Sequence, residues 1–503
     1  MLLQPVLPSD IVVKEEEYLK GRIAMKKSQF SAKLAYGAAD IYGGGSFLII
    51  SILYLVFLTD VVGMNPALAG SIPMIGKIWD ALTDPIMGNI VDRTQSKFGS
   101  KRFYLLIGSF VGSITFAMMW LTISGSATTL YFFYLLMYIL FSTGFTIVMV
   151  PYNALLPDMV SDYTQRSAFT MYRMIFSALS AILAGLVPNM IVNRLGDTQA
   201  QGFLIMGAVF GFIFFLSIFF TFIKSWETIQ PVIKTPFKES FRQSFSVFRN
   251  RSFRLYLGVF LFGQGSSDFI TTLIIYFLAV VLRQPDQYTF IMSGVLVSQL
   301  LAMFLYQLVL KKTSKKFPVY LGFPIRMIAT FSMIFFAYEQ APILPIFIAS
   351  FISGLGTAAS SVTSYAILTD LTDVDYLITT KRRAGVYSGM ATFNRKIANG
   401  IAIWLIGIML ALFQYDATAA IPSEITVNGI KFMFIALPLL FMVATLYFTY
   451  KFPITKTTYE CIQKEISRRL GELDDKASEE DIKTCEMVTG VPYNQLWRIE
   501  NSR

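Results

Sequence analysis

The strongest constraint in the sequence is a series of long apolar runs that recurs along the whole chain. Three of them read FLIISILYLVFL (47–58), GAVFGFIFFLSIFFTFI (207–223) and FMFIALPLLFMVATLYF (432–448). A helix needs about 20 mainly apolar residues to cross the hydrocarbon core of a membrane. Strands of a barrel would alternate polar and apolar residues, and these runs do not. Because only helices and closed barrels span lipid, the runs predict membrane-spanning helices.

The charge content supports this prediction. Only 15% of the 503 residues are charged, whereas a soluble domain carries about 25%. The mean hydropathy is +0.57. The net charge of +10 is assigned to basic loops at one membrane face, and no nucleic-acid partner is expected. The chain contains no histidine, which excludes His-based proton relays and most zinc sites.

The chain termini carry little targeting information. The first 30 residues are too charged for a cleavable signal peptide, so none is expected. The two cysteines, Cys461 and Cys485, lie in the polar C-terminal tail. We expect both to be free thiols in a reducing compartment.

The apolar runs predict an all-α integral membrane protein with about twelve spans. Basic residues gather in the loops that follow the second, eighth and tenth spans, so both termini are predicted to be cytoplasmic and the chain to lie in the plasma membrane. The predicted spans are 33–58, 67–91, 103–124, 129–152, 168–192, 202–223, 254–281, 289–310, 318–337, 342–368, 385–413 and 430–450.

The spans fall into two halves with similar local patterns. The predicted parts are an N-terminal extension (1–28), a six-helix bundle (29–223), a central loop (224–252), a second bundle (253–450) and a cytoplasmic tail (451–503). Two similar halves predict a transporter with a midplane site between them. The central loop spaces Phe237, Phe241, Phe245 and Phe248 as in an amphipathic surface helix. It could be a hinge or gate, or only a solvated linker.

Charged residues inside the second span are the best clue to mechanism. A charge at the bilayer centre costs about 2.5–3.5 kcal/mol on insertion scales. Lys77, Asp80 and Asp84 are spaced by three and four residues, so they project from one helix face. With the Thr83 hydroxyl, the two acids offer hard oxygen ligands to Na⁺. They could instead bind a proton, because burial and a neighbouring charge favour the neutral carboxyl. An internal salt bridge from Lys77 is the structural alternative.

Other spans also carry charges. Lys396 shares a helix face with Thr392 and Asn399 and could answer the carboxylates of the second span, whereas Arg395 is expected to point elsewhere. Arg173 could hold sugar hydroxyls or a carboxylate, or bridge to another helix. Candidate hydroxyl acceptors, with packing or gating as the alternative, are Asp40 and Asp268, and Asn153 is counted among the substrate contacts.

Several motifs resemble a known family. YLVFLTDVVGM, IWDALTDPIMGNIVDRTQSKFGSKR, VPYNALLPDMVSDYTQRS, LTDLTDVDY and FNRK are similar to motifs of the glycoside–pentoside–hexuronide:cation symporters. These form the melibiose-permease-like branch of the major facilitator superfamily. The resemblance covers about residues 33–450. It implies two pseudo-symmetric six-helix bundles and symport of a sugar or glycoside with Na⁺ or H⁺.

The resemblance also implies roles for matching residues. Asp80 and Asp84 match the cation-site acids, and Thr83 and Thr146 match positions that line that site. Lys396 matches a lysine linked to coupling, a role to which we add Lys77. Arg173 matches an arginine near the sugar. An inner-loop motif that bridges helices and gates the inner side is matched by Asp92, Arg93, Gly99, Lys101 and Arg102.

The chain departs from the family at two sugar-binding positions. Gly44 and Met149 stand where melibiose permease has aspartates. Asp40 lies one turn before Gly44 and could substitute. The resemblance therefore leaves the sugar open.

The predicted function is secondary symport of a glycoside, pentoside or uronide, with a sugar and the lipid bilayer as partners and no cofactor beyond the coupling ion. Two alternatives remain: a lysolipid or amphiphile transporter of the same fold, and a non-transporting sensor whose tail signals to a cytoplasmic partner. An enzyme is not expected, for want of a nucleophile–base or metal constellation. The oligomeric state stays open, a monomer included.

Overall fold

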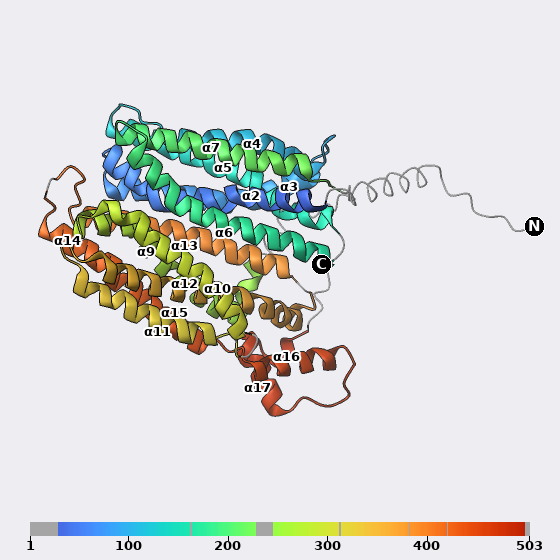
Figure 1. The fold of residues 1–503 in the computed structure, drawn as a ribbon. Coiled ribbons are helices and arrows are strands. Elements are labelled where there is room, and N and C mark those ends of the chain that lie inside the picture. The colour runs from blue at the N-terminus through green and yellow to red at the C-terminus, as the bar shows by residue number, and fades with distance from the viewer. Residues whose placement is uncertain are drawn as a thin grey trace, which may run out of the picture.

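The computed structural model describes residues 29–160, 163–227, 245–310, 313–381, 383–419 and 421–497. The predictions for 1–28, and for the part of the central loop with Phe237 and Phe241, lie outside these residues. The regular structure in the described part is helical, and it forms two bundles that lie side by side (Figure 1). The predicted all-α fold is confirmed.

The first bundle contains six helical segments. The first of them continues beyond α2 through two wider π-helical turns, Ile50–Tyr54 and Phe57–Val61. The helices are α2 (Gln29–Ile49), α3 (Pro66–Arg93), α4 (Ser100–Met118), α5 (Ala127–Met159), α6 (Tyr163–Arg194) and α7 (Gln199–Lys224).

The second bundle repeats this arrangement. Its first helix also ends in a π-helical turn, at Phe277–Val281, and its last segment is interrupted by another at Phe432–Ala436. The helices are α9 (Arg251–Tyr276), α10 (Tyr288–Leu310), α11 (Phe317–Ser332) with a tight turn at Met333–Phe336, α12 (Ile343–Thr379), α13 (Ala384–Leu412), α14 (Glu424–Lys431) and α15 (Leu437–Lys451).

Local sequence explains several helix starts. The Asn65 side chain accepts a hydrogen bond from the Ala67 amide, and Pro66 occupies the first turn of α3, where no amide donor is needed. Asn250 caps α9 in the same way. The capping boxes of the tail helices start at Thr455 and Ser478.

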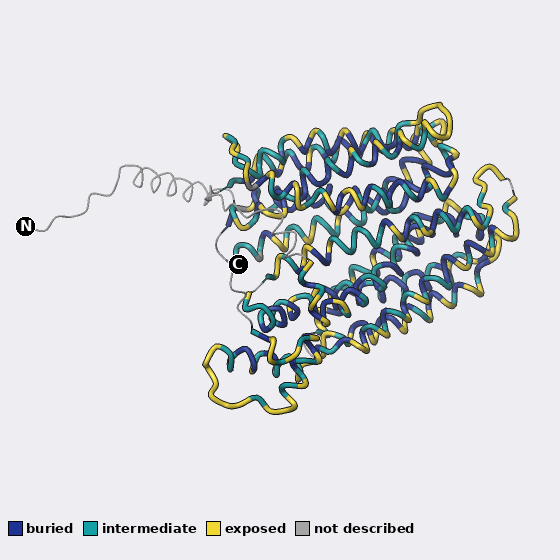
Figure 2. Tube along the Cα trace, turned by 180° about the vertical axis from the view of Figure 1, so that it is seen from behind, coloured by how far each residue is buried: buried dark blue, intermediate teal, exposed yellow. Residues whose placement is uncertain are grey.

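The outer surface of the bundles fits lipid. Ten helices in the described residues are long and apolar enough to cross a membrane. The two remaining long helices are α3, which carries the charged stripe, and the shorter α4, which packs between α5 and α7. Figure 2 shows buried residues inside the bundles and exposed residues along their outer faces. Large apolar side chains that are more than half exposed include Phe212, Phe304, Ile328 and Phe335.

Two predicted spans were too short at their C-terminal ends. The fourth span was expected to end near residue 152 and the tenth near 368, but α5 continues to Met159 and α12 to Thr379. The predicted spans ended where the polar residues of PYNALLPDM and LTDLTDVDY begin. The helices instead continue beyond the apolar runs of the sequence, and Pro151 and Pro157 lie inside α5.

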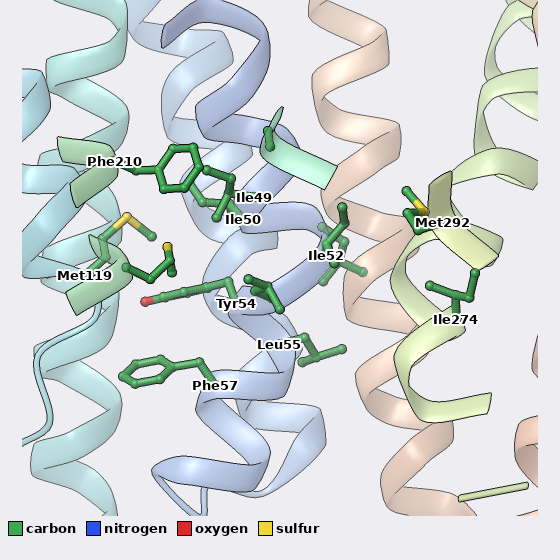
Figure 3. Close-up of a cluster of buried hydrophobic side chains, with 14 of the residues drawn as sticks. Ile49, Ile50, Ile52, Tyr54, Leu55, Phe57, Met119, Phe210, Ile274 and Met292 are labelled. Atoms are coloured by element: carbon green, nitrogen blue, oxygen red, sulfur yellow. The ribbon is translucent and has the colours of Figure 1, made fainter. Parts of the chain in front are cut away.

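The two ends of the bundle differ. We call the end that carries α16 (Lys456–Arg469) and α17 (Glu479–Thr489) the tail end, and the opposite one the far end. Towards the far end an apolar cluster joins both halves: Figure 3 shows Ile52 and Leu55 on the side of Ile274 and Met292. At the tail end, α16 and α17 pack against α9 and α12 of the second bundle.

Candidate functional site

A cavity of about 470 Å³ lies between the two halves. Its walls come from α2 and the turn after it, α3, α5, α9 and α13. Phe47 and Phe145 provide aromatic surface. The uncharged polar lining residues are Ser51, Asn153, Ser267, Thr271, Thr392 and Asn399. The cavity therefore combines aromatic faces with hydrogen-bonding groups, which is how small ligand sites are usually built.

Two carboxylates stand at one side of this cavity. Asp80 is fully buried, and Asp84 lines the cavity with about a third of its side chain exposed. They lie one helical turn apart on α3 because their spacing is four residues. The Thr146 hydroxyl from α5 lies 2.9 Å from Asp80 Oδ1 and 3.0 Å from Asp84 Oδ1. Three oxygen-bearing side chains therefore converge from two helices.

Lys396 completes the cluster from the other half of the molecule. Its Nζ atom lies 2.8 Å from Asp80 Oδ2 and 2.5 Å from Asp84 Oδ2. The ammonium thus bridges both carboxylates and joins α13 to α3. A monovalent cation coordinated by the same oxygens would compete with it. The structure brings together four of the predicted site residues, which are Asp80, Asp84, Thr146 and Lys396.

The other two predicted members of this group lie differently. Lys77 Nζ is 3.0 Å from the centroid of the Phe47 ring, a cation–π contact, and the bridge to the acids is made by Lys396 instead. The Thr83 hydroxyl donates to the backbone carbonyls of Trp79 and Asp80, at 3.0 and 3.2 Å. The Thr83 hydroxyl therefore donates its hydrogen bond within α3.

A second ion pair lines the cavity beside the cluster. Arg395 Nη1 and Nη2 each donate to one Asp268 oxygen at 2.7 Å, so the pair is bidentate. Arg395 was expected to point elsewhere than Lys396, and it bonds Asp268 of α9, whereas Lys396 bonds the carboxylates of α3. Arg395 nevertheless lines the same cavity as Lys396.

The equivalent pair of the first half lies apart from the cavity. Arg173 Nε donates to Asp40 Oδ1 at 3.2 Å, and its guanidinium lies 4.8 Å from the centroid of the Tyr152 ring. Neither residue of this pair is among the described residues that line the cavity. Asn153, by contrast, does line it.

The two positions that depart from the family pattern bring no acid to the cavity. Met149 lines the cavity where the resemblance implies an acid. A Cβ atom at Gly44 would meet only Ser177 Oγ, at 3.5 Å. The neighbouring Gly43 is packed between Met149 and Asp40 Oδ1.

The inner-loop motif ties helices of the first half together. Gly99 has φ +94°, and a Cβ atom there would collide with the Glu227 carboxylate. That carboxylate accepts hydrogen bonds from the Ser100 and Lys101 amides at 3.1 and 2.9 Å and so caps α4. Lys101 pairs with Asp158.

Two further residues of the motif are described. Arg102 Nη2 donates to the Phe222 carbonyl at 3.0 Å, and Arg93 is exposed at the end of α3. The side chain of Asp92 lies outside the described residues. Sequence reasoning missed Glu227, which lies more than 120 residues from its amide partners.

At the far end the two halves meet in a polar contact that sequence reasoning also missed. Thr59 Oγ1 lies 3.1 Å from the Tyr276 hydroxyl of the second half. Next to it, the Tyr415 hydroxyl donates to Asp60 Oδ1 at 3.0 Å. These bonds join the first span of one half to the first span of the other and to the loop after its fifth span.

Known proteins resemble the chain over most of its length. The family model described as MFS/sugar transport protein matches residues 35–456. An uncharacterized symporter of Synechocystis sp. is 25% identical, covering 89% of this chain and 98% of that protein. The isoprimeverose transporter of Lactiplantibacillus pentosus is 22% identical, over 82% and 86% of the two chains. The sodium-dependent lysophosphatidylcholine symporter 1-A of Danio rerio is 22% identical, over 85% and 86%.

Solved structures support the fold. A bacterial homologue of the human lysosomal transporter Spinster has a TM-score of 0.63 at 14% sequence identity, covering 84% of this chain and 96% of that one. This likeness concerns the arrangement of helices alone. Together with the family match, which spans most of the chain, it shows that the protein is a multi-pass membrane protein that belongs to the MFS/sugar transport protein family.

Proposed function

We propose that the protein is a secondary symporter that moves a sugar or glycoside into the cell together with Na⁺ or H⁺. The observation that carries this proposal is the contact of Lys396 with both Asp80 and Asp84 at the wall of the central cavity. Two acids and one ammonium form a site whose occupant can be exchanged for a coupling cation. A purely structural ion pair would need only one of the acids.

The carboxylates can serve either ion. Their oxygens, with Thr146 Oγ1 close to both, provide the hard ligands that Na⁺ prefers. A proton would instead neutralise Asp84, which borders the cavity. The hydroxyl contact favours Na⁺. In both cases the cation displaces the Lys396 ammonium from at least one carboxylate.

Substrate would bind beside this cluster. The Asp268–Arg395 pair offers both acceptors and donors, and Asn153, Thr392 and Asn399 add neutral hydrogen-bonding groups. Phe47 and Phe145 can cover the apolar face of a sugar ring. A polyhydroxylated solute with one apolar face uses all of these groups. Since Arg395 and Lys396 are neighbours on α13, bound sugar and bound cation would influence the same helix.

Alternating access follows from the two ends of the bundle. The halves are joined at the far end by the apolar cluster and the Thr59–Tyr276 contact. Opening that end while closing the tail end would carry the site across the membrane. We propose that the tail end is cytoplasmic, because the basic loops gather there. We also propose the plasma membrane as the location.

The first experiment is uptake by the purified full-length chain in proteoliposomes. Labelled glycosides, pentosides and uronides are tested under an imposed Na⁺ gradient, a proton gradient or neither. We expect one gradient to drive accumulation and the double variant Asp80→Asn/Asp84→Asn to abolish it. Accumulation by the double variant equal to that of the parent would show that the acids are not the coupling site.

Transport of a lysolipid is the second candidate. It is favoured by the similarity to the zebrafish lysophosphatidylcholine symporter. The same vesicles loaded with lysophosphatidylcholine distinguish it, because a sugar symporter should move no lysolipid. A sensor, the third possibility, would accumulate neither solute.

A further inference from the structure

A buried guanidinium in the second half lies outside the site described above. Arg326 stands about midway along the 20-residue span formed by α11 and the turn after it, and its side chain is only 1% exposed. Its Nη1 atom donates to Ser266 Oγ on α9 at 3.0 Å. Its Nε atom has no acceptor among the described residues. An arginine in this place is expected to have a negatively charged partner.

Three other basic side chains near the middle of the described spans have such partners. Arg173 contacts Asp40, Arg395 contacts Asp268, and Lys396 contacts two carboxylates. Lys77 lies on the same helix face as those two carboxylates, and its Nζ atom contacts the Phe47 ring. The ion pairs of the described residues supply no carboxylate to Arg326. The Arg326 guanidinium in the core of the second half is therefore a buried positive charge that contacts no carboxylate among the described residues.

Buried hydroxyl groups without partners lie on the helices around this charge. Ser360 Oγ on α12 and Thr330 Oγ1 on α11 are both buried and have no hydrogen-bond partner among the described residues. A hydroxyl in a membrane helix commonly donates to a backbone carbonyl one turn earlier, as Thr357 does to Ser353. A buried polar group that makes no hydrogen bond is costly. Both hydroxyls therefore have an unused donor.

Close helix packing brings these groups together. A Cβ atom at Gly356 would collide with the Arg326 side chain, so α12 runs directly against it. A Cβ atom at Gly263 on α9 would collide with Ser360 Oγ. Ser266 Oγ donates to the carbonyl of the same glycine at 2.7 Å. Thr330 lies one turn beyond Arg326 on the same face of α11.

From this arrangement we propose that Arg326 binds a small monovalent anion, of the size of chloride, together with the hydroxyls of Ser360 and Thr330. The available groups are N–H and O–H donors, which suit an anion that accepts several hydrogen bonds. A single negative charge balances the single guanidinium. The bound anion would hold α9, α11 and α12 together in the second half.

The position of the site favours a small ion over part of the substrate. Arg326 and Ser360 do not line the central cavity in the described structure, whereas Ser267, which follows Ser266, does. Ser267 Oγ is also buried without a partner. An ion that enters from the cavity would pass this hydroxyl. A sugar acid would have to part α9 from its neighbours.

The test measures chloride binding to the purified full-length protein in detergent. Thermal unfolding is followed at constant sodium concentration while chloride replaces gluconate, and binding of radiolabelled chloride is measured by equilibrium dialysis. We expect a saturable rise of the unfolding midpoint with chloride and bound radiolabel approaching one ion per chain. Arg326→Gln should abolish both. Ser360→Ala, which keeps the arginine, should raise the half-saturating chloride concentration about tenfold.

Arg254→Gln is the matched control, since Arg254 is an exposed arginine bonded to backbone carbonyls at the tail end. It should keep the full chloride response. The proposal is overturned if the parent binds no chloride, or if Ser360→Ala and Arg326→Gln bind it as the parent does. It is equally overturned if glucuronate, and not chloride, shifts the midpoint through Arg326.

Discussion

Each half of the molecule contains an aspartate–arginine pair on its first and fifth helices, but the two pairs differ in place and geometry. Asp268 and Arg395 join α9 to α13 through two hydrogen bonds of 2.7 Å and line the central cavity. Asp40 and Arg173 join α2 to α6 through one hydrogen bond of 3.2 Å, and Tyr152 covers the guanidinium.

The two aspartate–arginine pairs therefore have different proposed roles, although they occupy equivalent positions in the two halves. Of α6 and α13, which carry these two arginines, α13 alone has a lysine next to the arginine, and Lys396 reaches across to α3. The pair in the second half therefore lies between the cavity and the proposed cation site. The pair in the first half joins α2 to α6 and lies apart from the cavity and from the proposed cation site. At the tail end, by contrast, each half has a similar ion pair. Lys101 pairs with Asp158 in the first half, and Lys315 pairs with Asp370 in the second.

The largest expected effect comes from breaking the pair that lines the cavity. Arg395→Gln removes two charge-assisted hydrogen bonds at the cavity wall and takes from the proposed substrate site its guanidinium donors, a loss of about 3 kcal/mol. Since 1.4 kcal/mol is a factor of ten, we expect gradient-driven uptake to fall at least about 100-fold. Uptake normalised to folded protein measures this. Adding Asp268→Asn should restore folding yield and leave uptake low. Recovery of uptake in the double variant would mean that the pair only supports packing.

Arg173→Gln is the matched variant in the first half and should have a smaller effect. The bond it removes is single, and about 30% of the Arg173 side chain is exposed. A loss of about 1 kcal/mol predicts uptake reduced about fivefold, with the coupling ratio unchanged. The same uptake assay checks it. A loss as large as that of Arg395→Gln would place Arg173 in the substrate site, as the family resemblance implies.

The smallest effect on transport is expected from the tail, whose helices α16 and α17 pack on α9 and α12 of the second half. Ile466 and Val488 belong to a buried cluster with Phe253 and Leu371. Ile466→Ala should lower stability by about 2–5 kcal/mol, because it leaves a cavity in that cluster. The thermal midpoint should fall while uptake per folded molecule stays within about twofold. Uptake lost at an unchanged midpoint would favour the sensor alternative, in which the tail has a signalling role.

Sequence patterns predicted much of the architecture for a simple reason. Crossing lipid requires long apolar helices, and their number and order are visible in one dimension. The spacing of Asp80 and Asp84 likewise placed both acids on one helix face. Boundaries failed where helices continue past the apolar runs of the sequence, as α5 does to Met159.

Contacts between helices were harder to predict. Helical periodicity shows which residues share one face of a helix, but it does not show which other helix that face packs against. The Lys396 contact was anticipated as a possibility, with the family resemblance as support. No such indication was visible in the sequence for Glu227, Asp60 and Arg326. Each of them bonds a residue in a distant segment of the chain. Only the packing of the bundles shows that Glu227 has amide partners and that Arg326 meets no carboxylate among the described residues.

The most direct test of the central claim compares two kinds of transport in Lys396→Met. If the Lys396 ammonium holds the place of the coupling cation, the variant should lose gradient-driven accumulation at least about 100-fold and keep cation-independent exchange of labelled for unlabelled sugar. Lys451→Met, at an exposed lysine at the end of α15, should keep both. If Lys396→Met accumulated sugar as the parent does, the proposed exchange of ammonium for cation between Asp80 and Asp84 would be wrong.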